Sequence, residues 1–385
     1  MADDRMTELL RTRPVTTPAM LAVFSDHTTI AHALAFESAL AMAQAGTGVI
    51  PPDIAQAIAD ACATLVIDHA ELADEAALAG TLAIPLVARL RAAVGGEAAA
   101  AVHKGATSQD VADTVLMMQA RAAADLVRAD LARATVALAG LAARHAETPA
   151  IGRTLLQDAL PVAFGLRIAH WMAGIDDAAR RLRRDVADHA LLQLGGAAGS
   201  CAGLNGTGEV VAADMARALG LGAGPPWHAR RIGVAAIGTS LAIAIGALGK
   251  MARDVALLSQ NAVGEAREPA VAGRGGSSAM AHKRNPTGCQ VALSAATRAP
   301  GLAASLLGGL PQEEERGLGG WQAETPVLTD LFLLAAGSAA AMADIAEGLE
   351  IDAPAIARNL AAAGIGSDIG DSAAIVRALI TRQQG

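Results

Sequence analysis

Residues 275–288 concentrate chemically active side chains in a chain that is otherwise dominated by Ala, Leu and Val. The segment reads GGSSAMAHKRNPTG and contains Ser277, Ser278, His282, Lys283 and Asn285. Hydroxyl groups beside cations in a loop are suited to binding an anion and moving a proton next to it. Because the same composition is also typical of a solvated loop between helices, the order of the residues has to decide between the two interpretations.

Three further polar segments interrupt the apolar sequence. Residues 103–110, HKGATSQD, precede a long stretch without Gly or Pro, and Thr107 with Asp110 predicts a capping box at a helix N-terminus, where carboxylates bind well. Residues 152–161 read GRTLLQDALP. Residues 193–201, QLGGAAGSC, follow no predicted strand, so they predict a close-packed turn beside the site in preference to a phosphate-binding loop.

Residues 276–286 resemble the signature of the fumarase/aspartase superfamily, GSSxMPxKxNP. Gly276 to Met280, Lys283, Asn285 and Pro286 match it, whereas Ala281 stands where the superfamily has proline. A proline at this position would fix φ and reduce the conformational entropy of the unfolded chain, an effect of roughly 0.4–1 kcal/mol. Without it we expect a more flexible loop that still supports the reaction.

Two other superfamily patterns are also similar to this chain. TSxDxxDT resembles Thr107 to Asp110 followed by Asp113 and Thr114, and GRTHxQxAxP resembles residues 152–161, with Leu155 in place of the histidine. The resemblance implies roles for eight substrate-binding residues: His103, Thr107, Ser108, Arg153, Thr154, Gln157, Asn285 and Arg316.

Superfamily members eliminate a group β to a carboxylate, and the resemblance implies that Ser277 moves the carbon-bound proton, with Ser278 as the alternative. Lys283 or His282, together with backbone N–H groups, would stabilise the serine alkoxide. No metal or organic cofactor is implied, and the nine histidines show no metal-binding spacing.

Leu155 restricts the class of reaction that the chain is expected to catalyse. A hydroxide or amine leaving group needs a general acid, whereas a carboxylate, whose conjugate acid has a pKa of about 4, attacks or leaves as the anion. Leucine is therefore compatible with a cycloisomerase that lactonises a small unsaturated tricarboxylate, and the flanking segments around 193–201 and 311–324 also resemble the cycloisomerase members. That resemblance implies aromatic catabolism through the protocatechuate branch of the β-ketoadipate pathway. The alternatives are another superfamily lyase acting on a succinyl adduct, such as adenylosuccinate, or a helical oligomer without activity.

Composition restricts the kinds of partner that the chain is expected to bind. The net charge is −8, aromatic residues make up 2% and tyrosine is absent, so the sequence predicts binding neither to nucleic acid nor to an anionic membrane. Three widely spaced cysteines and an N-terminal segment, MADDRMTELLRTRP, without an apolar core predict a reduced cytoplasmic protein without a signal peptide.

Helical periodicity and the scarcity of strand signals predict an all-α protein. We expect five long helices, at about 111–146, 159–193, 232–263, 287–309 and 325–347, in one elongated bundle. The expected organisation is an N-terminal helical domain over residues 1–104, a central bundle over 105–347 and a short C-terminal helical domain over 348–385. Residues 232–249 are uncharged on every face, which predicts a buried helix and self-association. The resemblance implies a homotetramer with shared active sites.

Overall fold

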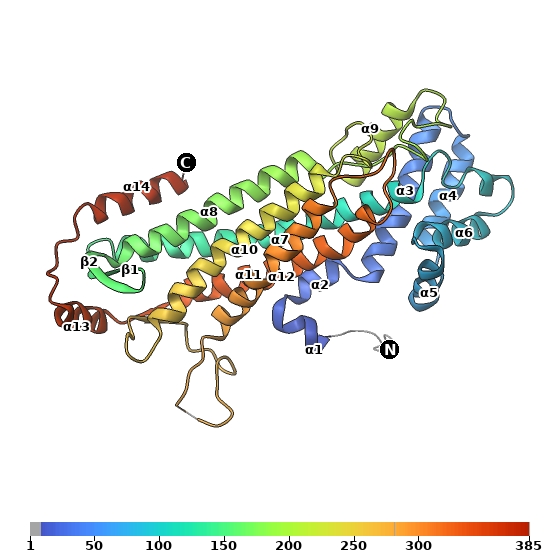
Figure 1. Cartoon of the computed structure of the whole chain (residues 1–385). Helices are drawn as coiled ribbons and strands as arrows, with labels where there is room; N and C mark the ends of the chain where they lie inside the picture. The colour runs from blue at the N-terminus through green and yellow to red at the C-terminus, as the bar shows by residue number, and fades with distance from the viewer. Residues whose placement is uncertain (1–8, 281, 385) are drawn as a thin grey trace.

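The structure is a computed structural model that describes residues 9–280 and 282–384, and Ala281, where the signature loses its proline, lies outside the described residues. Five long helices run side by side as an elongated bundle, with smaller helical groups at its two ends (Figure 1). They are α7 (Ser108–Arg144), α8 (Phe164–His189), α10 (Ile232–Leu258), α11 (Thr287–Gly308) and α12 (Gly320–Gly348). The predicted all-α class is confirmed, and four of the five predicted long helices begin and end within a few residues of those observed.

The prediction for residues 159–193 was wrong at its N-terminal end. Residues Pro149–Thr154 form strand β1, which pairs antiparallel with β2 (Gln157–Ala163), and α8 begins only at Phe164. The two strands form a hairpin at one end of the bundle, between α7 and α8. The pairing shifts register between Ile151 and Arg153, which hides the alternation of side chains that would have indicated a strand.

The N-terminal group of helices packs at the end of the bundle where α7 begins. Its longest member, α3, begins after the N-cap Ser25, whose side chain accepts the backbone N–H of Thr28. The elements are α1 (Leu9–Thr12), η1 (Arg13–Val15), α2 (Pro18–Val23), α3 (Asp26–Gly46), α4 (Pro52–Thr64), α5 (His69–Ala79), α6 (Ala83–Val94) and η2 (Glu97–Ala101).

The remaining elements flank the bundle. Helix α9 (Gly208–Leu219) packs on α3 at the N-terminal end, whereas α13 (Ala353–Ala363) packs on β1 at the opposite end. Strand β3 (Ala266–Arg267) pairs antiparallel with β4 (Glu350–Ile351), and α14 (Ser372–Gln384) returns along α8. This arrangement places the chain following α10 at the same end of the molecule as the hairpin.

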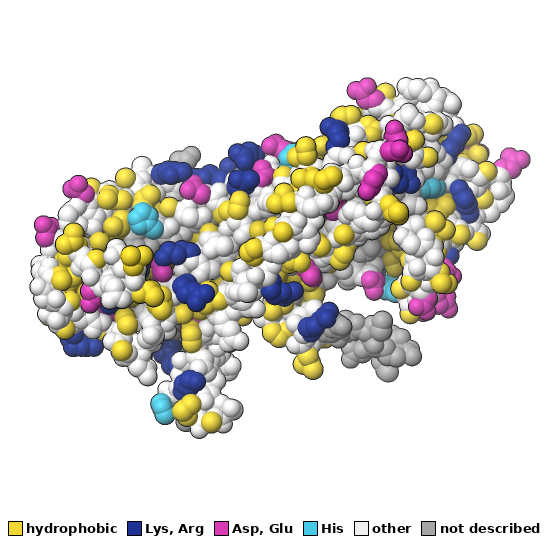
Figure 2. Space-filling view, viewed as in Figure 1, with side chains coloured by type: hydrophobic (Ala, Val, Ile, Leu, Met, Phe, Trp, Pro, Cys, Tyr) yellow, Lys and Arg dark blue, Asp and Glu magenta, His cyan; other side chains and the backbone are white. Residues whose placement is uncertain are grey.

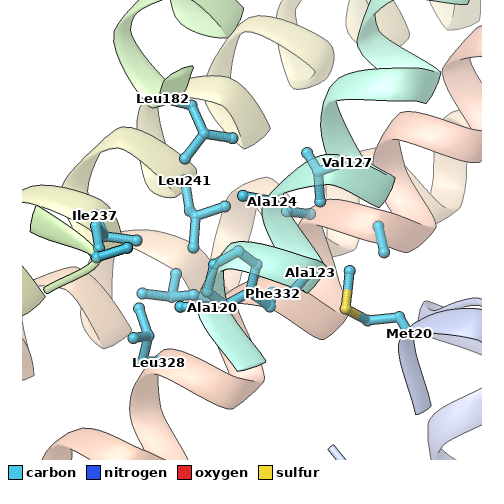
Figure 3. Close-up of a cluster of buried hydrophobic side chains, with 14 of the residues drawn as sticks. Met20, Ala120, Ala123, Ala124, Val127, Leu182, Ile237, Leu241, Leu328 and Phe332 are labelled. Carbon is cyan, nitrogen blue, oxygen red and sulfur yellow. The ribbon is translucent and has the colours of Figure 1, made fainter. Parts of the chain in front are cut away.

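The core of the bundle is made of small and branched apolar side chains (Figure 3). Ala120, Ala123 and Ala124 of α7 face Leu241 of α10 and Phe332 of α12, and all five are 0–1% exposed. Alanine is the best helix former and leaves room for neighbouring helices to approach, so a chain with few aromatic residues still fills its core.

Two helices, α10 and α12, are long and apolar enough to cross a membrane, with mean hydropathies of 2.0 and 1.5. More than half of each apolar window is buried against the rest of the chain, 56% and 61% respectively. Length and composition are the only support for a membrane span, and core helices of a bundle show the same properties.

Candidate active site

The first group of predicted site residues lies at the N-terminus of α7. Thr107 is the N-cap, and its backbone N–H donates to Asp110 at 3.0 Å, which provides one half of the predicted capping box. The Thr107 hydroxyl accepts a hydrogen bond from Nη2 of Arg316 at 2.8 Å. The same Nη2 donates to the carbonyl of Ala197 at 3.0 Å. Arg316 therefore joins the N-terminus of α7 to the glycine-rich segment, and its buried Nε has no partner among the described residues.

A buried polar network fixes the glycine-rich segment behind this group. Asp110 is fully buried and accepts the backbone N–H groups of Gly195 and Gly196, both at 2.9 Å, which confirms the predicted close-packed turn. It also accepts Nε2 of Gln193 at 2.9 Å. Burial raises the pKa of Asp110 to about 6, although these donors and the N–H of Thr107 oppose that rise.

The same network fixes the hydrogen position on His228, a residue that sequence reasoning missed. Because Oε1 of Gln193 accepts the backbone N–H of Trp227 at 2.6 Å, the opposite end of the amide must be its donor. That donor lies 3.1 Å from Nδ1 of His228, so the imidazole carries its hydrogen on Nε2, which is buried without a partner among the described residues. Burial, and then the charge of Arg316, lower the pKa of His228, consistent with a neutral ring.

The second group lies on the β1–β2 hairpin at the other end of α7. Thr154 and Gln157 pair across a two-residue turn made by Leu155 and Leu156, and all four are exposed. Arg153 donates to both carboxylate oxygens of Glu265, at 2.9 and 2.7 Å. The guanidinium therefore ties the hairpin to the start of the signature loop, and in this chain Arg153 would reach a substrate only while sharing its charge with Glu265.

The third group lies on the signature loop, residues 264–286, which projects from the side of the bundle (Figures 1 and 2). Its base is held firmly. Arg284 donates to the carbonyl of Glu268 at 2.6 Å and to Glu350 at 3.2 Å. The carboxylate of Glu268 accepts the backbone N–H groups of Gly288 and Cys289, in the first turn of α11, at 3.0 and 2.6 Å.

Ser277 makes two hydrogen bonds within the signature loop. Its Oγ accepts the backbone N–H groups of Ala279 and Met280, at 3.3 and 3.1 Å, and both hydrogen bonds are exposed. Two aligned N–H donors stabilise negative charge on a serine oxygen. Three residues later, Met280 lines a cavity of about 760 Å³, together with His282, Lys283 and Asn285. Ser278, by contrast, is exposed.

The chain does not bring these three groups together. Helix α7 has 37 residues, so Thr107 and the hairpin are separated by roughly 55 Å at 1.5 Å per residue. The signature loop leaves the bundle at the hairpin end, where Glu265 contacts Arg153. His103, Thr107, Ser108 and Arg316 therefore lie at one end of the molecule, and the other predicted residues lie at or near the opposite end.

Comparison with known proteins places the chain in a family. The family described as Lyase matches residues 12–301, which is most of the chain. The chain is a member of this lyase family. A 3-carboxy-cis,cis-muconate cycloisomerase of Bradyrhizobium diazoefficiens is 48% identical over 89% of this lyase and 77% of the relative. The protein of the same name from Pseudomonas aeruginosa is 46% identical over 89% and 75%. The crystal structure of the 3-carboxy-cis,cis-muconate lactonizing enzyme from Pseudomonas putida superposes with a TM-score of 0.86 at 38% identity, covering 97% of this lyase and 87% of that chain.

Sequence reasoning also missed the buried ion cluster behind the first group. Arg231 is 1% exposed and donates two hydrogen bonds to Asp113, both at 2.7 Å, and further bonds to Glu324. Its guanidinium also lies over the ring of Trp227, 4.8 Å from the centroid. Asp113 belongs to the segment that resembles TSxDxxDT, which was the one available signal, whereas Arg231 lies 118 positions from Asp113 and 93 from Glu324.

Proposed function

We propose that this lyase is a 3-carboxy-cis,cis-muconate cycloisomerase. The observation that carries the proposal is the environment of Ser277, whose hydroxyl oxygen accepts two backbone N–H groups in a loop that also lines a cavity with Lys283 and Asn285. The names of the similar proteins support the substrate. The reaction belongs to protocatechuate catabolism, and free cysteines are consistent with a cytoplasmic location.

The proposed reaction forms one C–O bond and one C–H bond. A substrate carboxylate oxygen attacks a carbon of a C=C bond, and the π electrons move toward a carbon α to another carboxylate. Ser277 donates its proton to that carbon, and the alkoxide left behind is stabilised by the N–H groups of Ala279 and Met280 before it regains a proton. In reverse the same alkoxide is the base. Thr107, Ser108 and Arg316 would bind one carboxylate, and Gln157, Lys283 and Asn285 the others.

Leu155 favours this reaction over the elimination of an amine or of water. The side chain is 96% exposed at the hairpin tip, in the position of the superfamily's histidine, and it has no proton to offer a leaving group. A carboxylate nucleophile requires none. A lyase acting on a succinyl adduct would lack its acid at this position.

We further propose that active sites form between copies of the chain in a homotetramer. The three groups of site residues cannot meet within one chain, because α7 separates them by roughly 55 Å. The face of α10 that carries Ile232, Ile243 and Gly246 is exposed and uncharged as far as Lys250, which suits contact with another copy. We retain the division into residues 1–104, 105–347 and 348–385 as part of this proposal.

The activity is tested by mixing the protein with 3-carboxy-cis,cis-muconate and following loss of the diene absorbance, with NMR identification of the lactone. Ser277→Ala should lower kcat by roughly 10²–10⁴-fold, the usual contribution of a proton-transfer group. Ser278→Ala is the matched control and should lose much less. If Ser278→Ala is the inactive variant, the two serines exchange roles. A folded oligomer that consumes no muconate but releases fumarate from a succinyl adduct would refute the cycloisomerase, and one inactive on both would point to a protein without catalysis.

The shared site is tested by mixing two inactive variants, Ser277→Ala and Arg316→Ala, after dissociation and reassembly. If the two residues come from different copies, independent assortment restores about one quarter of the sites. If both belong to one chain, no site regains both residues and the mixture stays inactive. Sedimentation should give a tetramer, and a monomer with full activity would refute the assembly.

A further inference from the structure

Helix α3 carries a buried carboxylate that no motif assigns. Glu37 is 1% exposed, and its Oε1 lies 2.6 Å from Nδ1 of His103. Its other oxygen, Oε2, is buried and has no hydrogen-bond partner among the described residues. A buried carboxylate oxygen without a hydrogen-bond partner destabilises a fold.

The contact fixes the imidazole of His103. An ionised glutamate only accepts hydrogen bonds, so Nδ1 of His103 carries the hydrogen and the ring is oriented with Nε2 on the far side. Nε2 has no partner within the described chain, and the side chain retains 14% exposure.

The backbone around His103 is held by α3 and by the segment that follows it. His103 has a φ of 63°, a left-handed conformation that is unfavourable for a residue with a Cβ. Two contacts hold the turn there. Gln44 of α3 donates to the carbonyl of Lys104 at 2.6 Å, and Lys104 donates to the carbonyl of Val49 at 3.2 Å. Glu37 and Gln44 are seven residues apart, on one face of α3.

The turn is part of the group at the N-terminus of α7. Gly105 and Gly196 approach so closely that a Cβ on Gly196 would lie 2.7 Å from the carbonyl oxygen of Gly105. The carbonyl of Ala197, the next residue, accepts from Arg316, which also contacts Thr107. His103 therefore lies at the edge of the group in which Thr107 and Arg316 are proposed to bind a substrate carboxylate.

We propose that Glu37 is a positioning residue for this site: it holds His103 with Nδ1–H toward α3, so that Nε2 contacts the substrate carboxylate bound near Thr107 and Arg316. This inference rests on the proposed function for its substrate, but the state of His103 is measured without one. It predicts that Glu37 has its effect through His103 alone and not through the stability of the fold.

The test uses Glu37→Met in the full-length protein labelled with ¹⁵N-histidine. The resonances of His103 are assigned by their loss in His103→Asn. In the wild type Nδ1 should show a protonated shift and Nε2 should respond to added 3-carboxy-cis,cis-muconate. In Glu37→Met the fixed Nδ1–H form should be lost, and KM should rise by roughly 10–100-fold with a smaller change in kcat, the effect of losing one charge-assisted contact. The thermal midpoint should stay or rise, because methionine removes the unpaired Oε2.

Gln44→Met is the matched control, on the same face of α3 and contacting the same turn. It should lower the thermal midpoint, because the Lys104 carbonyl loses its donor, while the His103 signals stay as in the wild type. Equal changes in the His103 signals of both variants would overturn the proposal and make Glu37 a structural anchor.

A double-mutant cycle provides a second test in case Glu37→Met folds poorly. In a His103→Asn background, Glu37→Met should raise KM no further. Additive effects would overturn the proposal. If the protein does not turn over the muconate at all, the proposed function fails, and the Nδ1 signal alone decides the inference about Glu37.

Discussion

Substitutions at the tip of the β1–β2 hairpin test whether the two leucines there stabilise the fold or contribute to the proposed active site. Leu155 and Leu156 have φ values of 52° and 64°, and their side chains are 96% and 75% exposed. A two-residue hairpin turn with both φ values positive strongly favours Asn-Gly. We expect the double substitution Leu155→Asn and Leu156→Gly to stabilise the protein and to impair the reaction.

The magnitude follows from the backbone conformation. A left-handed residue with a Cβ costs about 1–2 kcal/mol, and Asn and Gly tolerate the same conformation far better. Little packing is lost, because neither leucine is buried within the chain. The hairpin should therefore gain about 2 kcal/mol, which raises the thermal midpoint of a chain of this length by a few degrees. Protein concentration must be held constant, because association also shifts the midpoint.

The assay compares the thermal midpoint and kcat/KM of the double variant with those of the wild type. Two exposed leucines at a turn that disfavours them are expected to form an apolar wall of the shared site, so kcat/KM should fall by at least about tenfold. Leu160→Gln is the matched control, since Leu160 is 78% exposed on the same hairpin but outside the turn, and it should change neither quantity. A raised midpoint with unchanged turnover would refute the functional reasoning, and an unchanged or lower midpoint would refute the estimate of strain.

Two further predictions concern buried charges. The folded-state pKa of Asp110, about 6, lies above its usual value of 3.8, so the native state binds the proton more tightly than the unfolded state does. The contribution of Asp110 to the free energy of unfolding therefore grows as pH falls from about 6 to 4, by at most about 3 kcal/mol. The gap in thermal midpoint between wild type and Asp110→Asn should therefore widen between pH 7 and 5, and a constant gap would contradict the assignment. Arg231→Met should destabilise the fold by about 3–5 kcal/mol in chemical denaturation, because Asp113 and Glu324 would face each other without their cation. Adding Asp113→Asn and Glu324→Gln should recover much of the loss, and no recovery would mean that Arg231 acts mainly through packing.

The long helices were predictable because their signals are local. Residues 111–139 contain no Gly or Pro, and their apolar positions repeat with helical spacing, so α7 follows from the sequence alone. The hairpin was missed because its turn is made of two leucines where a hairpin usually shows Asn-Gly, and because Gly152 sits at the register shift. A Cβ on Gly152 would lie 2.5 Å from the carbonyl oxygen of Leu160, so glycine is required there by packing and not by a turn.

The chemistry of the candidate site was predictable only where motifs name it. Ser277 and Arg316 stand in segments with fixed spacing, whereas Glu37 and His228 lie in stretches without any pattern. Glu37 contacts a residue 66 positions away and His228 one 35 positions away, and such pairs exist only after the chain folds. Motifs therefore led to the residues proposed to bind the substrate, whereas the buried residues that contact them from distant parts of the sequence were missed.

The isolated chain leaves Ser277 in an environment that water reaches. Its loop projects from the bundle, and Ser278, His282 and Lys283 around it are exposed. Two N–H donors stabilise an alkoxide far better where water is excluded, because the effective dielectric constant falls. The residues proposed to bind the substrate's carboxylates lie at the far end of α7 in the same chain, so a second copy that brings Thr107 and Arg316 to the loop would also cover it. On this reasoning, assembly supplies the low dielectric that makes a serine hydroxyl an effective acid and base, in addition to supplying the missing ligands.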